Sequence, residues 1–189
     1  MDMVCEYKAK RSLMVPVLFV LGMCVAIEGH AQASPSDSEK LKTLEFLIGE
    51  WKVYVNARLS KDGPWEKSEG HSTIKRAVGN SILEEDLKGT RQGREYIARY
   101  WMANDNRTLR YQWAIVDSDH GVLELYEGDM TNGTITLEKE IITPQVTILR
   151  RLVYSDLTPN SFKTQSLRSV DKGLTWDVTG SSRYERIGK

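Results

Sequence analysis

Charged side chains occupy several positions at which an alternating apolar pattern predicts a residue of the core. Alternate residues of a β-strand face the same side of a sheet, so a charge within an apolar row points toward the buried side. One carboxylate, Glu85, stands in such a row in the segment LEEDL. Arginines stand in three further rows, at Arg99, Arg150 and Arg168. We therefore expect up to three arginines and one glutamate to point into the interior of the fold.

Buried charges of this kind must find partners, because an unpaired charge away from water is strongly unfavourable. One interpretation is an internal network in which Glu85 pairs with an arginine. A second is a strand bulge that turns one of the arginines out to solvent. A third is a bound anion that balances the excess of arginine, since a guanidinium group presents a bidentate fork suited to a carboxylate or a phosphate. The sequence leaves all three open.

Aromatic side chains in a neighbouring row could form the wall of a binding site. Tyr111 and Trp113 share a row with Ile115 in the segment TLRYQWAIV. Large rings usually fill the core of a small barrel, and these two residues fit that role as well. The residues that we predict to bind a ligand are Glu85, Arg99, Tyr111, Trp113, Arg150 and Arg168.

Acid–base chemistry has two candidate residues in this sequence, Glu85 and His71. An inward carboxylate or imidazole can exchange a proton with a substrate, and a nearby arginine can stabilise developing negative charge. His71 can face either side of its strand, whereas His120 lies in the turn-like segment DSDHG. Two isolated histidines do not make a zinc site, so we predict no metal and no cofactor.

The elements that must position these residues are one short helix and many short strands. Ser36 and Glu39 form a capping-box pattern at the start of an apolar stripe that ends at Gly49. From Trp51 onward the period changes to two, and turn-like segments separate about ten short strands. One of these segments contains Asn-Gly at residues 132–133, the strongest short signal for a hairpin. The pattern predicts an all-β antiparallel sheet closed into a barrel or stacked as a sandwich.

The segment Gly49-Glu50-Trp51 has a physical rationale at the start of a barrel. The glycine lets the chain turn sharply into the first strand. The tryptophan then plugs the narrow end, and an arginine of the last strand can stack on it as a cation–π pair. Arg186 shares its row with Tyr184 and is the arginine that we expect there.

These features resemble the calycin superfamily, whose lipocalin members carry a Gly-x-Trp motif and a closing arginine. The sequence is more similar still to a family of bacterial calycin-like barrels of unknown function, DUF1579, which opens with the pattern L-x-G-x-W seen at residues 47–51. The segments YWMANDN, WAIVDS, DKGLTW and YER resemble further motifs of that family, although DKGL stands where DGGK is usual. The resemblance implies a calycin-like β-barrel of about ten strands after one short N-terminal helix, and it implies no general activity. Haem binding through a late histidine, as in one calycin-like group, is not expected, because no histidine follows His120.

The first 33 residues read as a secretory signal peptide, and residues 34–189 as the barrel domain. A basic segment precedes the apolar residues 12–27, and Ala31 and Ala33 supply the small residues of a cleavage site. The apolar run is shorter than the roughly 20 residues that span a bilayer, which favours a signal over a transmembrane helix. Both cysteines, Cys5 and Cys24, lie in the signal. We expect a secreted or periplasmic protein whose mature form has no disulfide.

The balance of charge gives the protein no bias toward nucleic acid or anionic lipid, since basic and acidic residues number 26 each. We predict an exported small-molecule-binding barrel that holds a partly apolar, anionic ligand inside, without nucleic-acid partners and without membrane association after signal cleavage. The oligomeric state stays open. An alternative is a cofactor-independent enzyme of the isomerase, cyclase or lyase type that uses an inward carboxylate or histidine. A third is a protein-interaction module that uses the outer face.

Overall fold

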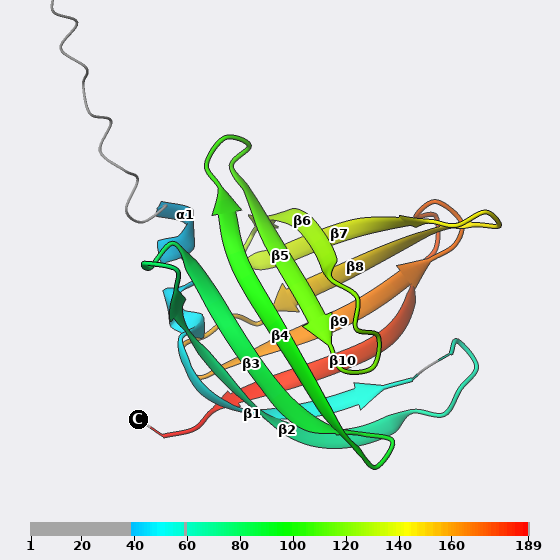
Figure 1. Ribbon diagram of the computed structural model, residues 1–189, viewed down its shortest axis with the longest axis horizontal. Coiled ribbons are helices and arrows are strands. Elements are labelled where there is room, and N and C mark those ends of the chain that lie inside the picture. Colours follow the sequence, from blue (N-terminus) through cyan, green and yellow to red (C-terminus); the bar gives the residue numbers. More distant parts are fainter. Residues whose placement is uncertain (1–38, 59, 189) are drawn as a thin grey trace, which may run out of the picture. The chain divides into compact units, whose positions relative to one another are not determined.

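Ten strands form one closed antiparallel barrel, and a short helical segment precedes it (Figure 1). This computed structural model describes residues 39–58 and 60–188. The strands are β1 (Gly49–Ala57), β2 (Glu66–Ala77), β3 (Ile82–Arg91), β4 (Arg94–Asp105), β5 (Arg110–Asp117), β6 (Glu124–Thr131), β7 (Thr134–Ile142), β8 (Thr147–Ser155), β9 (Ser161–Ser169) and β10 (Asp177–Arg186). Each strand pairs with its neighbours in sequence, and β1 also pairs with β10. The predicted all-β antiparallel barrel is confirmed.

Tight turns set this simple order of strands. Asn132 and Gly133 join β6 to β7 with φ values of 50° and 73°. Positive φ at both central residues is the requirement of the two-residue hairpin turn whose twist matches that of the flanking strands. The hairpin predicted from the Asn-Gly pair is therefore confirmed.

The helical segment is shorter than the apolar stripe suggested. It consists of α1 (Glu39–Lys42) and a 3-10 turn, η1 (Glu45–Leu47). The hydroxyl of Thr43 donates to the carbonyl of Lys40 at 2.6 Å, a local bond that competes with continuation of the helix. Ser36, the predicted capping residue, lies outside the described residues, as does the predicted signal peptide of residues 1–33.

One end of the barrel is closed by α1, η1 and the aromatic residue that follows them. Trp51 is fully buried, and its indole nitrogen donates to the carbonyl of Leu47 at 2.8 Å. The guanidinium of Arg186 lies 4.2 Å from the centre of the Trp51 ring and donates to the carbonyl of Ile48 at 2.8 Å. Gly49 has a φ of 147°, and a Cβ atom there would lie 2.1 Å from Nη1 of Arg186. Only glycine therefore leaves room for the arginine that stacks on the tryptophan.

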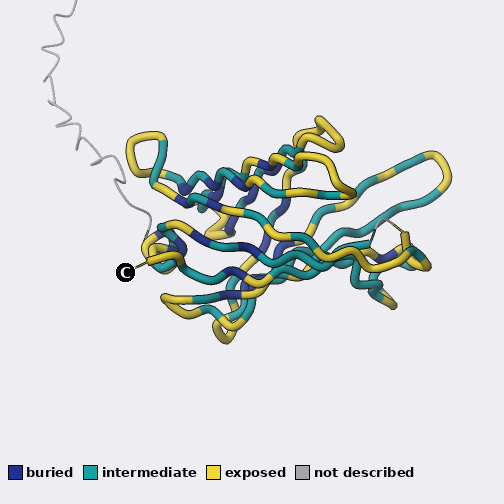
Figure 2. Tube along the Cα trace, turned by 90° about the horizontal axis from the view of Figure 1, so that it is seen from below, coloured by how far each residue is buried: buried dark blue, intermediate teal, exposed yellow. Residues whose placement is uncertain are grey.

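The interior is filled at the end that carries α1 and becomes more accessible toward the other end, which we call the open half. In Figure 2 the buried segments lie in the middle of the strands and toward α1. Aromatic rings of the core stack against one another across the barrel. The ring centroids of Trp113 and Tyr154 are 5.3 Å apart, and those of Phe162 and Tyr184 are 4.2 Å apart. In the open half the inward rows are half-buried, and they include Val55, Ser68, Leu152, Thr164, Ser166 and Ser182. Water can therefore reach the inner face there.

No helix among the described residues is long and apolar enough to cross a membrane.

Candidate functional site

Glu85 faces the packed part of the interior from the centre of β3. Its side chain is almost fully buried, between the inward leucines of the same strand. Oε1 accepts hydrogen bonds from the hydroxyl of Ser72 at 2.7 Å and from the hydroxyl of Tyr184 at 3.1 Å. Burial raises the pKa of the Glu85 carboxyl to about 7, although both hydrogen bonds act in the opposite direction.

The surroundings of Glu85 consist of hydroxyl groups and contain no arginine partner. Burial, together with the charge of Glu85, raises the pKa values of Tyr154 and Tyr184 well above their usual range. None of the ion pairs among the described residues includes Glu85, so the internal Glu–Arg network considered from the sequence does not form around it. Glu85 is instead a carboxyl group held by neutral hydroxyls.

Arg150 is the arginine that lies inside the barrel. Its row on β8 also contains Leu152 and the buried Tyr154. Nε of Arg150 is buried and has no hydrogen-bond partner among the described residues, which also place no carboxylate within ion-pair distance of it. The hydroxyl of Tyr126 lies close enough for Arg150 to lower the pKa of Tyr126 against the larger effect of burial. The side chain of Arg150 is half-buried, and its buried Nε is costly to leave unsatisfied unless a partner pairs with it.

A second polar pair stands beside Arg150 and was not found from the sequence. Lys139, whose Cα lies opposite that of Arg150 across β7 and β8, forms an ion pair with Glu124 at 2.6 Å. The hydroxyl of Tyr126 donates to the same carboxylate at 2.9 Å. Glu124 is therefore already engaged and does not neutralise Arg150. The signal in the sequence was weak, because Glu124 and Lys139 each stand at one end of a row.

Arg168 lies next to Arg150 but nearer to solvent. The two Cα atoms are paired across β9 and β8, and side chains that are directly opposite lie on the same side of a sheet. Arg168 is exposed, which places its guanidinium toward the rim of the open half. Two like charges directly opposite destabilise a strand pair. An anion between them would remove that cost.

Two of the predicted residues lie on the outer surface. Arg99 forms an ion pair with Asp86 at 2.8 Å, and its expected inward orientation is wrong. The register of β3 with β4 places Ala98, not Arg99, opposite Leu87 on the inner face. His71 is exposed on β2 and lies 2.9 Å from Glu50, so it is not available as an interior acid or base.

Tyr111 and Trp113 both face inward and are buried. The hydroxyl of Tyr111 lies 2.8 Å from that of Thr43, a contact that fastens α1 to the barrel. Nε1 of Trp113 is buried without a hydrogen-bond partner among the described residues. Tyr111 therefore belongs to the closed end. Trp113 lies opposite Tyr126 across β5 and β6, and the hydroxyl of Tyr126 lies near Arg150.

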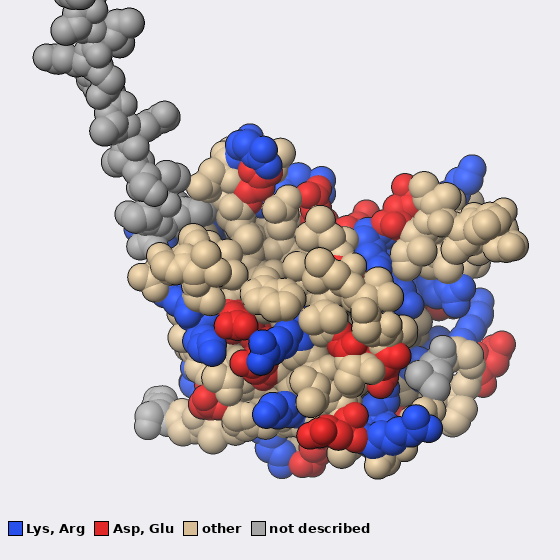
Figure 3. Space-filling model, viewed as in Figure 1, with Lys and Arg blue, Asp and Glu red and all other residues tan. Residues whose placement is uncertain are grey.

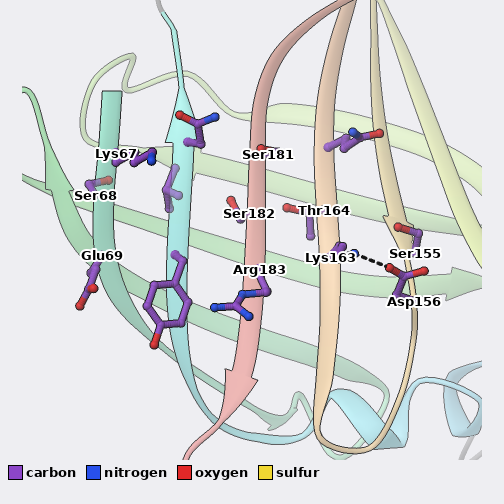
Figure 4. Close-up of a pocket in the computed structure, with 14 residues that line it drawn as sticks. Lys67, Ser68, Glu69, Ser155, Asp156, Lys163, Thr164, Ser181, Ser182 and Arg183 are labelled. Atoms are coloured by element: carbon purple, nitrogen blue, oxygen red, sulfur yellow. Dashed lines mark ion pairs between the residues drawn. The ribbon is translucent and has the colours of Figure 1, made fainter. Parts of the chain in front are cut away.

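Two hollows lie on the barrel where β1 and β2 contribute to their lining. The smaller, of about 340 Å³, lies at the rim between β1, β2 and the turn after β3, and Val55, Ser68 and Arg91 contribute to its lining. The larger, of about 840 Å³, lies along β2, β1, β10 and β9 (Figure 4). Most of its lining residues belong to the outward rows of these strands, so it is a groove on the outer side of the sheet. The described residues contain no cluster of three metal-ligating side chains.

Acidic and basic side chains are interspersed on the face shown in Figure 3, over β3, β4 and β5. Some are paired across strands, as Arg99 of β4 is with Asp86 of β3. Leu123 and Leu125 are exposed, at 65% and 55%.

Comparisons with known proteins agree with this architecture. The solved structure of Rv2717c from M. tuberculosis has a TM-score of 0.55 and 12% identity, and the match covers 80% of this chain and 99% of that one. The structure of the S-type phycobiliprotein lyase CPES from Guillardia theta has a TM-score of 0.52 and 12% identity, with 78% of this chain and 92% of that one covered. At such identity the similarity shows the fold alone. No curated protein matches the chain. Residues 36–181 match the family described as "Protein of unknown function (DUF1579)", and the chain belongs to this family.

Proposed function

We propose that the protein binds a small, partly apolar carboxylic acid in the open half of its barrel. The observation that carries this proposal is Arg150, an inward guanidinium with a buried Nε that has no partner among the described residues. A carboxylate accepts two parallel hydrogen bonds from a guanidinium, and it would supply the charge that Arg150 lacks. Arg168, its cross-strand neighbour at the rim, would guide the anion inward.

The remainder of the ligand would lie against the half-buried inner rows. Leu152 and Val55 offer apolar contact, while the hydroxyls of Thr164 and Ser182 provide a small number of polar contacts. With Ser68 and Ser166 also in these rows, the wall combines two apolar side chains with several hydroxyls, which suits a ligand that is only partly apolar. We also propose that the protein acts after export, because residues 1–33 have the pattern of a secretory signal.

The test is a calorimetric titration with a series of carboxylated amphiphiles and their neutral methyl esters. A methyl ester cannot accept the charge-assisted bidentate bond, whose loss costs about 1.5–3 kcal/mol, so acids should bind roughly 10- to 150-fold more tightly. Arg150→Met keeps much of the volume of the stem and should abolish this preference while apolar binding persists. Arg99→Met is the matched control, since Arg99 lies outside, and it should leave the preference intact. Equal binding of acid and ester by the unmodified protein would contradict the proposal.

A cofactor-independent enzyme remains the second candidate because of one observation, the pKa of about 7 at Glu85. A carboxyl with such a pKa suits general acid–base catalysis near neutral pH. Its burial argues for the binding role instead, because Glu85 is only 1% exposed and its hydrogen bonds go to the core. Glu85→Gln separates the two candidates: a binder keeps its ligand, whereas an enzyme that uses this carboxyl loses turnover.

A further inference from the structure

The groove along β2, β1, β10 and β9 is lined mainly by outward rows of these strands and does not include Arg150. Its volume of about 840 Å³ falls within the range of about 300–1,000 Å³ typical of small-molecule sites. Figure 4 shows Lys67, Arg183 and Lys163 entering it from three different strands. Such an arrangement on adjacent strands is fixed by the register, in which Asn56 pairs with both Lys67 and Ser181.

The side chains of the groove are rich in hydrogen-bonding groups. Hydroxyls come from Ser155 and Ser181, and amides from Asn56 and Gln165. Oδ1 of Asn56 is buried and has no hydrogen-bond partner among the described residues. An amide in this state can turn about its last side-chain bond and offer either of its polar atoms to a ligand. The lining therefore suits a ligand with many hydroxyl groups.

The charges of the groove favour an anion whose charges are well separated. Lys163 is paired with Asp156 at 2.8 Å, and Glu69 is paired with Lys52 at 2.9 Å. Lys67 has no carboxylate partner among the ion pairs of the described residues. Arg183 is paired with Glu185 at 2.8 Å, so Lys67 is the cation of the lining that a negative charge on a ligand would balance. A dense polyanion would instead meet repulsion from Asp156 and Glu69.

The aromatic wall of the groove is held in place by cations. Arg183 and Lys52 each lie 4.8 Å from the centre of the Tyr54 ring. These contacts place cations over the ring, so it is the hydroxyl of Tyr54 that is left to contact a ligand. A fixed phenol hydroxyl beside amides and serine hydroxyls is suited to the hydroxyl edges of sugar rings.

We infer that this groove is a second ligand site, which takes an acidic carbohydrate of the uronic-acid type. Hydroxyls of the sugars would pair with Asn56, Gln165 and Ser181, while a ring carboxylate would pair with Lys67 or Arg183. The site is open and shallow, so it would accept an internal stretch of a chain as readily as its end. Its charged groups are distinct from Arg150, although Val55, Thr164 and Ser182 contribute to the lining of the groove as well as to the inner rows.

The experiment is a calorimetric titration of the full-length barrel domain with a short oligouronate, a neutral oligosaccharide of the same length and a linear polyphosphate. Saturable binding is expected for the oligouronate. The neutral sugar should bind at least about 10-fold more weakly, because it lacks the charge-assisted bond. Polyphosphate should bind more weakly than the oligouronate, and equal or tighter binding would reduce the groove to a general polyanion surface and overturn the inference.

Single substitutions test whether the oligouronate binds in the groove. Lys67→Met and Arg183→Met should each weaken oligouronate binding about 10-fold or more. Lys75→Met is the matched control, since Lys75 lies on the same strand outside the groove and pairs with Glu84. Arg150→Met should change nothing here. Loss of oligouronate binding in Arg150→Met, with Lys67→Met unaffected, would place the sugar in the interior and overturn the inference, as would the absence of binding to the unmodified protein.

Discussion

Glu85 keeps its proton to about neutral pH because its carboxyl is buried among hydroxyl groups that do not carry positive charge. Water would favour the charged form, and Ser72 and Tyr184 only partly replace water as donors. The folded protein therefore holds this proton up to about pH 7, whereas the unfolded chain releases it near 4.5. The stability that the protonated group contributes is complete below the lower value and is lost as the pH rises through the higher one.

Replacing Glu85 with glutamine should remove this dependence on pH. The amide oxygen can still accept from Ser72 and Tyr184, and the side chain never ionises. One pKa unit corresponds to about 1.36 kcal/mol. The free energy of unfolding of Glu85→Gln should therefore be roughly 3 kcal/mol higher than that of the unmodified protein at about pH 8. At about pH 4.5, where Glu85 is protonated in the folded protein, the two should differ by less than roughly 1 kcal/mol. Urea unfolding at both pH values measures this, and parallel pH profiles would show that Glu85 is ionised in the fold.

The residues that the sequence placed correctly are those with a local reason for their position. Gly49 and Trp51 belong to one short motif, and Arg186 was found because it shares a row of the last strand with Tyr184. Arg99 and Arg150 could not be told apart in this way. Both stand in apolar rows, but the outer face of β4 is itself apolar, and only the register with β3 shows which row is inside.

At the scale of elements, the pairing of β6 with β7 depends on one close approach. A Cβ atom at Gly128 would lie 1.8 Å from the carbonyl oxygen of Thr136 and 2.8 Å from Cα of Leu137. The two backbones can therefore come together only if this position has no side chain. The pair also carries the interior ion pair of Glu124 with Lys139, so its geometry bears on the surroundings of Arg150.

Gly128→Ala should consequently force these strands apart. Overpacking of a core typically costs about 1–3 kcal/mol, and a clash with backbone belongs at the upper end, about 3 kcal/mol. Thermal unfolding measures it, with a loss of about 2–4 °C in melting temperature for each kcal/mol. Gly180→Ala is the matched control, because the nearest atom there is 3.7 Å away, and it should not lower the melting temperature. Similar losses in both variants would mean that the close approach at Gly128 is not what limits the sheet.

The sequence predicted the strands more accurately than the helix for a physical reason. Alternation over ten strands is repeated many times, and the Asn-Gly turn is specified by its own backbone requirement. A helix of a few residues has too few periods to define its ends. Its break near Thr43 comes from a side-chain hydrogen bond that periodicity does not report.

At the scale of the whole molecule, the two ends of the barrel differ in how tightly their interior is packed. The end with α1 and Trp51 is packed, and it supplies the stability of a chain whose cysteines both lie in the first 33 residues. The open half retains accessible inner rows and Arg150. Alternation predicted that Arg150 points inward, but the lack of a partner for its Nε could not be predicted, because partners across the barrel depend on the closed geometry. The two similar structures share the barrel fold, and the family carries no assigned function.

The proposed export would set the compartment in which the protein meets a ligand. If residues 1–33 are a signal peptide, N-terminal sequencing of the protein isolated from its host should begin at or near Ser34. Ala33→Pro should block or shift the cleavage, because the peptidase reads a small residue at that position. A mature protein that retains residues 12–27 would contradict the proposed localisation.

The most direct test of the central claim is methyl NMR of the protein during titration with a carboxylated amphiphile. Inward methyl groups that do not line the outer groove belong to Leu87 and Leu152, whereas those of Leu125 and Ile97 lie on the outer face. If the ligand lies inside the barrel beside Arg150, the inner resonances should shift with saturation and the outer ones should not. The same titration with Arg150→Met should require a much higher concentration of the acid. Shifts confined to the outer methyl groups, or equal shifts in the variant, would contradict the account.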